Sequence, residues 1–230
     1  MGCGVMVKRA KQISDSLELG MLLALVGGFM DVYSYMGRGG VFANAQTGNI
    51  LLFGVHLSEG AWGLSLKYLF PVLSFAFGIM LADLIHARMA SVLHWRQGSI
   101  LIEASILLGV SFIGPNLNLL ANCLTSFACG VQVESFRKIH GRGIATTMCI
   151  GNLRSALQNV DDYIINHEPG FLANAALYAI VIATFVLGAV LGNWSLERFG
   201  LASIRIATLL LVICFLIMFI DREHREEIRR

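Results

Sequence analysis

The residues of this chain that could do chemistry are acidic side chains and two clusters of amides and glycines set within apolar sequence. The candidate set along a solute or ion pathway is Asp31, Asn44, Gln46, Thr47, Gly48, Asn49, Glu134, Gly151 and Asn152. Carboxylates bind protons and cations, and amides donate and accept hydrogen bonds without carrying charge. Glycine lets the backbone itself approach a solute. These residue types favour binding or conduction over covalent catalysis.

The sequence contains no recognisable motif for catalysis or for metal binding. The six histidines form no H-E-x-x-H motif, no Ser or Cys nucleophile motif accompanies them, and the five cysteines form no C-x-x-C pair. We therefore expect no enzyme activity, no metal site and no cofactor. A net charge of +2 provides no broad basic surface, so nucleic acid is not an expected partner.

Each acidic or amide candidate has a functional and a structural interpretation. A carboxylate such as Asp31 within an apolar helix is costly unless it faces a partner or water. It either binds a proton or cation, or it caps the neighbouring polar segment. Glu134 precedes Arg137 at a spacing that favours a structural salt bridge. A third acid, Glu103, could reach the membrane surface or pair with Arg96.

The glycine and asparagine pairs have two interpretations as well. If a half-helix begins at Thr47, its free N–H groups and positive dipole end attract an anion or a substrate carboxylate. Alternatively, Asn49 and Asn152 tie off backbone that no regular element satisfies.

The composition indicates that membrane-spanning helices position these residues. The chain is 56% hydrophobic and 14% charged, with a mean hydropathy of +0.70, whereas soluble domains carry about 25% charged residues. A spanning helix needs about 20 mostly apolar residues. Six stretches qualify: 17–36, 66–87, 99–114, 117–136, 171–193 and 202–220. We predict an all-α integral membrane protein with a single membrane domain, 17–220, between an N-terminal tail, 1–16, and a charged tail, 221–230.

Residues 41–57 and 144–160 are shorter and carry the amide clusters. If both spanned, giving eight helices, the basic loops near Arg88 and Arg137 would lie outside, against the positive-inside tendency. If both instead enter and leave on one side, six spans remain and the inside holds 13 of the 17 basic residues. Six spans with two re-entrant segments are favoured, with both termini cytoplasmic and Arg38 as an exception outside.

The two halves resemble each other. Aligning Gly48-Asn49 with Gly151-Asn152, an offset of 103 residues, also pairs Gly27 with Gly130 and Asp31 with Glu134. After a seven-residue insertion, Gly78 meets Gly188. The halves, about 17–115 and 116–220, each contain three spans. An odd number of spans inverts the second half, and inverted repeats with broken segments at the midplane are a recurrent transporter design.

The first half carries G-G-x-x-D-x-x-S-Y over 27–35 and then V-F-x-x-x-x-T-G-N over 41–49. This order and spacing resemble the YoaK family of bacterial membrane proteins, a domain of unknown function, DUF1275. The resemblance extends over essentially the whole chain and implies about six spans in the inner membrane, with no established substrate. Ile150 departs from the family pattern, where a Thr is more usual.

These observations favour a small-solute or ion permease of the bacterial inner membrane, with its pathway between two inverted halves. The alternative is a membrane-embedded structural or accessory protein whose polar motifs only stabilise the fold. The lipid bilayer is the expected partner. Gly188-x-x-x-Gly192 is suited to close helix packing, either within the chain or in a homodimer.

Overall fold

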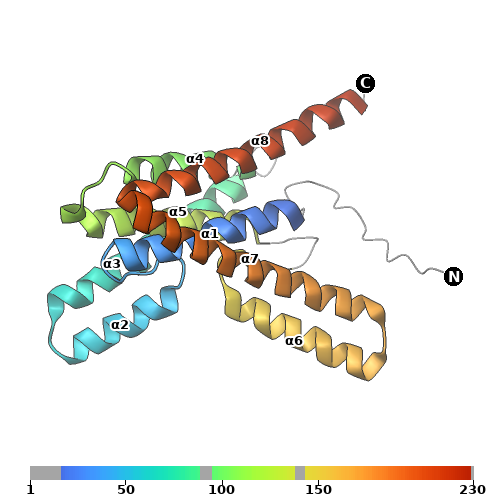
Figure 1. Ribbon diagram of the computed structural model, residues 1–230, viewed down its shortest axis with the longest axis horizontal. Coiled ribbons are helices and arrows are strands. Elements are labelled where there is room, and N and C mark those ends of the chain that lie inside the picture. Colours follow the sequence, from blue (N-terminus) through green and yellow to red (C-terminus); the bar gives the residue numbers. More distant parts are fainter. Residues whose placement is uncertain (1–16, 89–94, 138–142, 229–230) are drawn as a thin grey trace.

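The computed structural model describes residues 17–88, 95–137 and 143–228, and all regular structure in these ranges is helical. The predicted N-terminal tail, 1–16, lies outside them. The helices are α1 (Leu17–Gly37), α2 (Gln46–Ser58), α3 (Trp62–Arg88), α4 (Trp95–Val110), α5 (Asn118–Ser135), α6 (Cys149–Asn166), α7 (Pro169–Phe199) and α8 (Ile204–Ile228) (Figure 1). The all-α prediction is confirmed for these residues. The backbone of α8 continues well into the predicted C-terminal tail.

Two helical hairpins are closed by short turns whose residues suit them. Gly60, with φ +70°, lies between α2 and α3. His167 takes a left-handed conformation, φ 55°, at the end of α6, and Pro169 occupies the first turn of α7, where its missing N–H costs nothing. In Figure 1 the hairpin of α2 and α3 and that of α6 and α7 diverge from the rest of the bundle.

Three helical stretches of the described residues are long and apolar enough to cross a membrane: Leu17–Gly37, Trp62–Arg88 and Pro169–Met218. Many large apolar side chains, such as Phe77, Met80 and Val190, are exposed on the surface. A lipid environment accounts for such exposure, since water would penalise it. By contrast α2 has 13 residues, about 20 Å of helix, and cannot cross a hydrocarbon core of roughly 30 Å.

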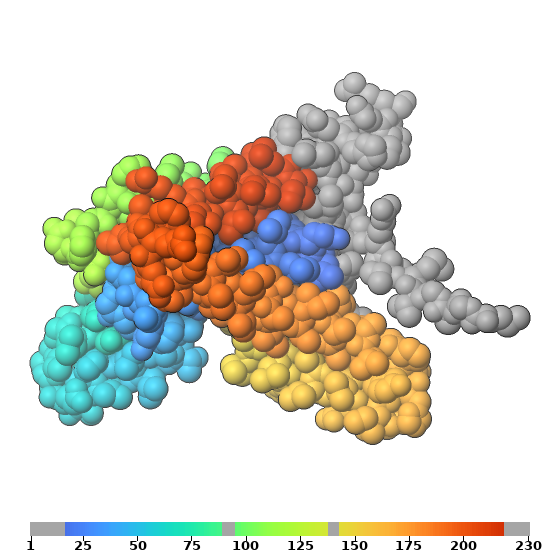
Figure 2. Space-filling view, viewed as in Figure 1, coloured from blue at the N-terminus to red at the C-terminus, as the bar shows by residue number. Residues whose placement is uncertain are grey.

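The core is centred on α1, which contributes Leu23, Phe29, Met30 and other fully buried side chains. α1 packs mainly on α7 and also on α8, while α5 packs on α3 and α4, and α4 packs on α8. In the space-filling view, the surface is hollowed between the lobe of α2 with α3 and the lobe of α6 with α7 (Figure 2). The site described below opens from this region.

Glycine permits the two closest helix crossings. A Cβ placed on Gly28 of α1 would overlap the backbone carbonyl of Phe185 on α7, and one on Gly78 of α3 would overlap the carbonyl of Phe127 on α5. Gly188 and Gly192 both face α1, and a Cβ on Gly192 would lie 3.1 Å from Cα of Phe29. The small-x-x-x-small pattern of α7 therefore serves packing within the chain.

Glu103 lies deeper than the sequence predicted. It is 1% exposed, and both carboxyl oxygens have no hydrogen-bond partner among the described residues. Glu103 therefore neither reaches the surface nor hydrogen-bonds to Arg96, the two alternatives from the sequence, because its helix face packs into the core beside Ile100, Ala104 and Leu107.

Candidate functional site

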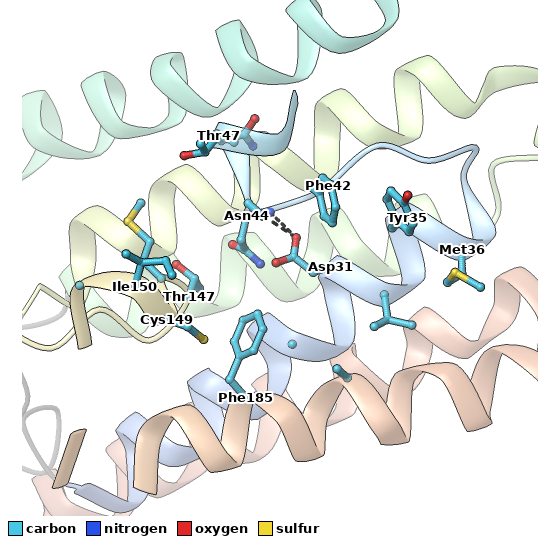
Figure 3. A pocket seen from close by; sticks show the side chains of 17 residues that line it. Asp31, Tyr35, Met36, Phe42, Asn44, Thr47, Thr147, Cys149, Ile150 and Phe185 are labelled. Atoms are coloured by element: carbon cyan, nitrogen blue, oxygen red, sulfur yellow. Dashed lines mark hydrogen bonds between the residues drawn. The ribbon is translucent and has the colours of Figure 1, made fainter. Parts of the chain in front are cut away.

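A cavity of about 610 Å³ lies where the starts of α2 and α6 approach α1 and α7 (Figure 3). Its walls are formed by α1, the segment that leads into α2, the segment that leads into α6, and α7. The lining residues are Gly28, Asp31, Val32, Tyr35, Met36, Phe42, Asn44, Ala45, Gln46, Thr47, Thr147, Met148, Cys149, Ile150, Gly151, Phe185 and Ala189. Segments about 100 residues apart in the chain therefore share one hollow.

Asp31 connects α1 to the start of α2. Its Oδ1 accepts hydrogen bonds from the backbone N–H of Asn44 (2.7 Å) and of Ala45 (3.3 Å). No side chain of the α2 segment caps that helix, so the carboxylate supplied by α1 satisfies amides at its positive end. Asp31 thus makes the cap that the structural interpretation expected. It also lines the cavity, as the functional interpretation requires.

Amide side chains at the start of α2 hold this part of the chain in place. Asn44 Nδ2 donates to the Gly27 carbonyl (3.1 Å), while its Oδ1 is buried and has no partner among the described residues. Gln46 Nε2 donates to the Ala43 carbonyl (2.8 Å). Asn44, Gln46 and Thr47 all line the cavity, so the structure brings these three predicted residues together with Asp31.

Asn49 and Asn152 make the same arrangement in the two halves. Asn49 Nδ2 donates to the carbonyl of Phe42 (2.8 Å), and its Oδ1 accepts from the Phe42 N–H (2.9 Å). Asn152 does so with Ala145, at 2.7 and 3.3 Å. Each asparagine thereby clamps the backbone seven residues earlier. Neither lines the cavity, and their side chains support the predicted backbone-tying interpretation.

Of the remaining predicted residues, one lines the cavity and two lie elsewhere. Gly151 lines the cavity, and a Cβ there would meet open space. Gly48 instead packs against the Phe42 ring, 2.7 Å from where its Cβ would stand. Glu134 forms an ion pair with Arg137, which also reaches Asp83 (2.9 Å), and it does not line the cavity. The salt-bridge interpretation of Glu134 agrees with this geometry.

Sequence reasoning missed several residues of the site. Thr147, Met148 and Cys149 were within the polar segment that drew attention, but nothing in the sequence indicated which of its side chains face inward. Tyr35 and Phe42 stack with their ring centres 4.5 Å apart, and Phe185 comes from α7. Phe185 lines the cavity because α7 packs against α1, and no pattern within the sequence of α7 predicts that contact.

The described residues contain no group of three or more His, Cys, Asp or Glu side chains that could hold a metal ion. The chemistry available in the cavity is therefore that of one carboxylate, a few neutral polar groups, two helix starts and apolar walls.

The model of the family described as "Protein of unknown function (DUF1275)" matches residues 19–217. The chain is similar to the "UPF0700 transmembrane protein YoaK" of Bacillus subtilis (strain 168), with 26% identity over 182 residues, which cover 74% of this chain and 79% of that protein. No solved structure matches.

Proposed function

We propose that this chain, which belongs to the DUF1275 family of proteins of unknown function, is a small-solute or ion permease of the bacterial inner membrane. Its substrate binds in the cavity between the starts of α2 and α6. The observation that carries the proposal is the convergence of the starts of α2 and α6 and of the Asp31 carboxylate on one cavity. The similarity to a protein named as transmembrane supports the location.

The proposed topology has six spans, α1, α3, α4, α5, α7 and α8, with α2 and α6 as re-entrant helices. The chain leaves the end of α1, returns to Asp31 in the middle of that helix, and only then begins α2. Because α2 is too short to span and forms a hairpin with α3, it enters and leaves on one side. In the second half, α6 likewise packs on α7, which follows it after a short turn.

The packing supports an inverted repeat. α1 packs on α7 of the other half, and α5 packs on α3 in the same manner. The asparagine clamps repeat at the aligned offset of 103 residues. At the crossings, Gly28 meets Phe185 while Gly130 meets Phe75, so Gly28 rather than Gly27 takes the place of Gly130. This register shifts α1 by one residue and pairs Asp31 with Val133, which leaves Asp31 without an acidic counterpart.

Cysteine labelling tests the topology. Single cysteines at Ser58 and Gly98, in a cysteine-free background, should be reached by a membrane-impermeant maleimide from the periplasmic and cytoplasmic faces respectively. Ser58 is exposed at the end of α2, and a Cβ at Gly98 meets open space. Labelling of Gly98→Cys from the periplasmic face would exclude the six-span topology.

Flux through reconstituted vesicles tests the permease. We expect proteoliposomes to admit at least one solute of a panel of inorganic ions, amino acids, amines and sugars. Asp31→Asn keeps an oxygen for the α2 cap but removes the charge. Loss of a charged hydrogen-bonding group costs about 1.5–3 kcal/mol, so flux at low substrate concentration should fall about 10- to 100-fold.

The matched control is Glu59→Gln, which neutralises an exposed carboxylate at the end of α2 that pairs with His56. Its flux should equal that of the unmodified protein. If no solute of the panel moves, and Asp31→Asn changes only the unfolding temperature, the accessory-protein interpretation replaces the permease.

A further inference from the structure

The starts of α2 and α6 face the same cavity but differ in charge. The positive end of α2 is compensated by Asp31, whose Oδ1 accepts from two amides. Among the described residues, no carboxylate accepts a hydrogen bond from the first amides of α6, and the N-cap residue, Met148, makes no side-chain cap. Glu134, the acid nearest to the corresponding place in the sequence of the second half, is engaged with Arg137. The α2 side of the cavity therefore carries a negative charge, whereas the α6 side keeps the positive end of its helix dipole.

The α6 side of the cavity offers a threonine hydroxyl and the first amides of a helix as hydrogen-bond donors. The first-turn amides of a helix have no partner within the helix, and α6 is long enough, at 18 residues, to carry a full dipole end. Thr147, immediately before it, is 3% exposed, and its Oγ1 has no hydrogen-bond partner among the described residues. Its methyl group faces Gly27, and Figure 3 shows the side chain at the cavity wall beside Cys149 and Ile150.

A buried hydroxyl without a hydrogen-bond partner costs free energy unless a group bound in the cavity accepts its hydrogen bond. A carboxylate placed there would accept from the Thr147 hydroxyl and from the first amides of α6, which is how helix starts bind anions. The bare Cα of Gly151, the third residue of α6, lets such a group approach the backbone closely.

The α1 side offers the opposite charge. Both hydrogen bonds to Asp31 fall on Oδ1, and none of standard geometry reaches Oδ2 from the described residues. Asp31 and Cys149, the first residue of α6, line the same cavity. Tyr35, one helical turn after Asp31, stacks on Phe42 and forms an aromatic wall next to it. A carboxylate beside aromatic faces suits an ammonium group.

We propose that the cavity binds a zwitterion, a small molecule of the amino-acid class whose ammonium group lies at Asp31 and whose carboxylate lies at the start of α6 and Thr147. Its apolar part packs against the aromatic and methionine side chains of the wall, among them Phe185, Met36 and Met148. The inference rests on the proposed function, since it names the substrate class of that site.

Binding is tested on purified full-length protein in detergent, by the shift in unfolding temperature and by calorimetry. The zwitterionic probes are glycine, L-proline and L-leucine. Two further probes each keep one charge of leucine, isopentylamine the ammonium and 4-methylpentanoate the carboxylate. We expect at least one zwitterion to stabilise the protein, and for leucine we expect a Kd about tenfold or more below that of either half-molecule.

Two nearly isosteric variants test the binding of the ammonium group and of the carboxylate group separately. Asp31→Asn should abolish the response to isopentylamine and keep the response to 4-methylpentanoate. Thr147→Val should weaken 4-methylpentanoate and keep isopentylamine. Thr184→Val is the control for the loss of a hydroxyl, because the partly exposed Thr184 side chain does not line the cavity and donates to the Ile180 carbonyl of its own helix.

Two results would overturn the inference. One is that no zwitterion stabilises the unmodified protein. The other is that isopentylamine binds as tightly as leucine while Thr147→Val changes nothing, which describes a cation site. Uptake of the bound zwitterion into proteoliposomes separates the two proposals. Binding without uptake rejects the permease and keeps the zwitterion site, whereas flux confined to other solutes rejects the zwitterion and keeps the permease.

Discussion

Replacement of Arg38 by Met should lower the free energy of unfolding by about 3–5 kcal/mol, because several buried hydrogen-bond acceptors lose their donor. The side chain is 0% exposed. Its Nε and Nη2 donate to Oη of Tyr33 at 3.0 and 2.8 Å, and Nη2 also donates to the Val110 carbonyl at 3.0 Å. Nη1 donates to the Gly114 carbonyl and to Oδ1 of Asn118.

The guanidinium therefore ties the end of α1 to the turn between α4 and α5. Methionine fills the volume but leaves several buried acceptors without donors, at about 1–3 kcal/mol for each. Arg38→Lys should recover only part of the loss, because an ammonium cannot span this fork of acceptors.

Denaturant unfolding in detergent measures this effect. Arg205→Met is the matched control: Arg205 is exposed on α8, donates to Oγ of Ser111 at 3.2 Å and lies over Phe112, so its loss should change stability by less than about 1 kcal/mol. A variant Arg38→Met as stable as Arg205→Met would show that the network contributes little. In the proposed six-span topology, the same burial accounts for a basic residue on the outer side, since the Arg38 guanidinium is held by protein groups.

Gly28→Ala, like Gly188→Ala, should be among the most damaging methyl additions at the described glycines. The new Cβ would overlap the carbonyl oxygen of Phe185, and it would stand only 3.0 Å from the backbone nitrogen of Ala189. Both neighbours are backbone, so no side chain can rotate away and α1 must separate from α7. Overpacking of this kind costs about 1–3 kcal/mol, occasionally more, and we expect about 3 kcal/mol here.

Unfolding of Gly28→Ala, compared with the unmodified protein in the same detergent, measures the cost, and Gly188→Ala should behave alike because it meets the Leu25 carbonyl. Gly109→Ala, in α4, is the control with the opposite sign. A Cβ there meets no atom within 4 Å, so the higher helix propensity of alanine should stabilise by up to about 1 kcal/mol. Equal stability of the Gly28 and Gly109 variants would contradict the packing of α1 on α7.

How much of the site could be predicted depends on the range of the interactions involved. Asp31, Asn44, Gln46 and Thr47 were recognisable because a polar side chain in apolar sequence needs a reason to be there. The clamp made by Asn49 spans only seven residues and is nearly local. Alignment of the two halves predicted Glu134 as a site residue, because it paired Glu134 with Asp31. The glycine crossings place the helices one residue away from that alignment, so Glu134 is not the counterpart of Asp31. The sequence could not report this shift, because the register of a helix is set by the helix it packs on.

The amino-acid sequence by itself determined the helical class, the positions of the apolar helices and the two polar segments between them, because hydropathy and helix length are local properties of the chain. Only the tertiary structure decided that Asp31 caps α2 while the start of α6 stays open, that Phe185 and Thr147 join the same wall, and that Arg38 and Glu103 are buried. These features arise where helices distant in the sequence meet, and the close approach that glycine allows is what brings them together.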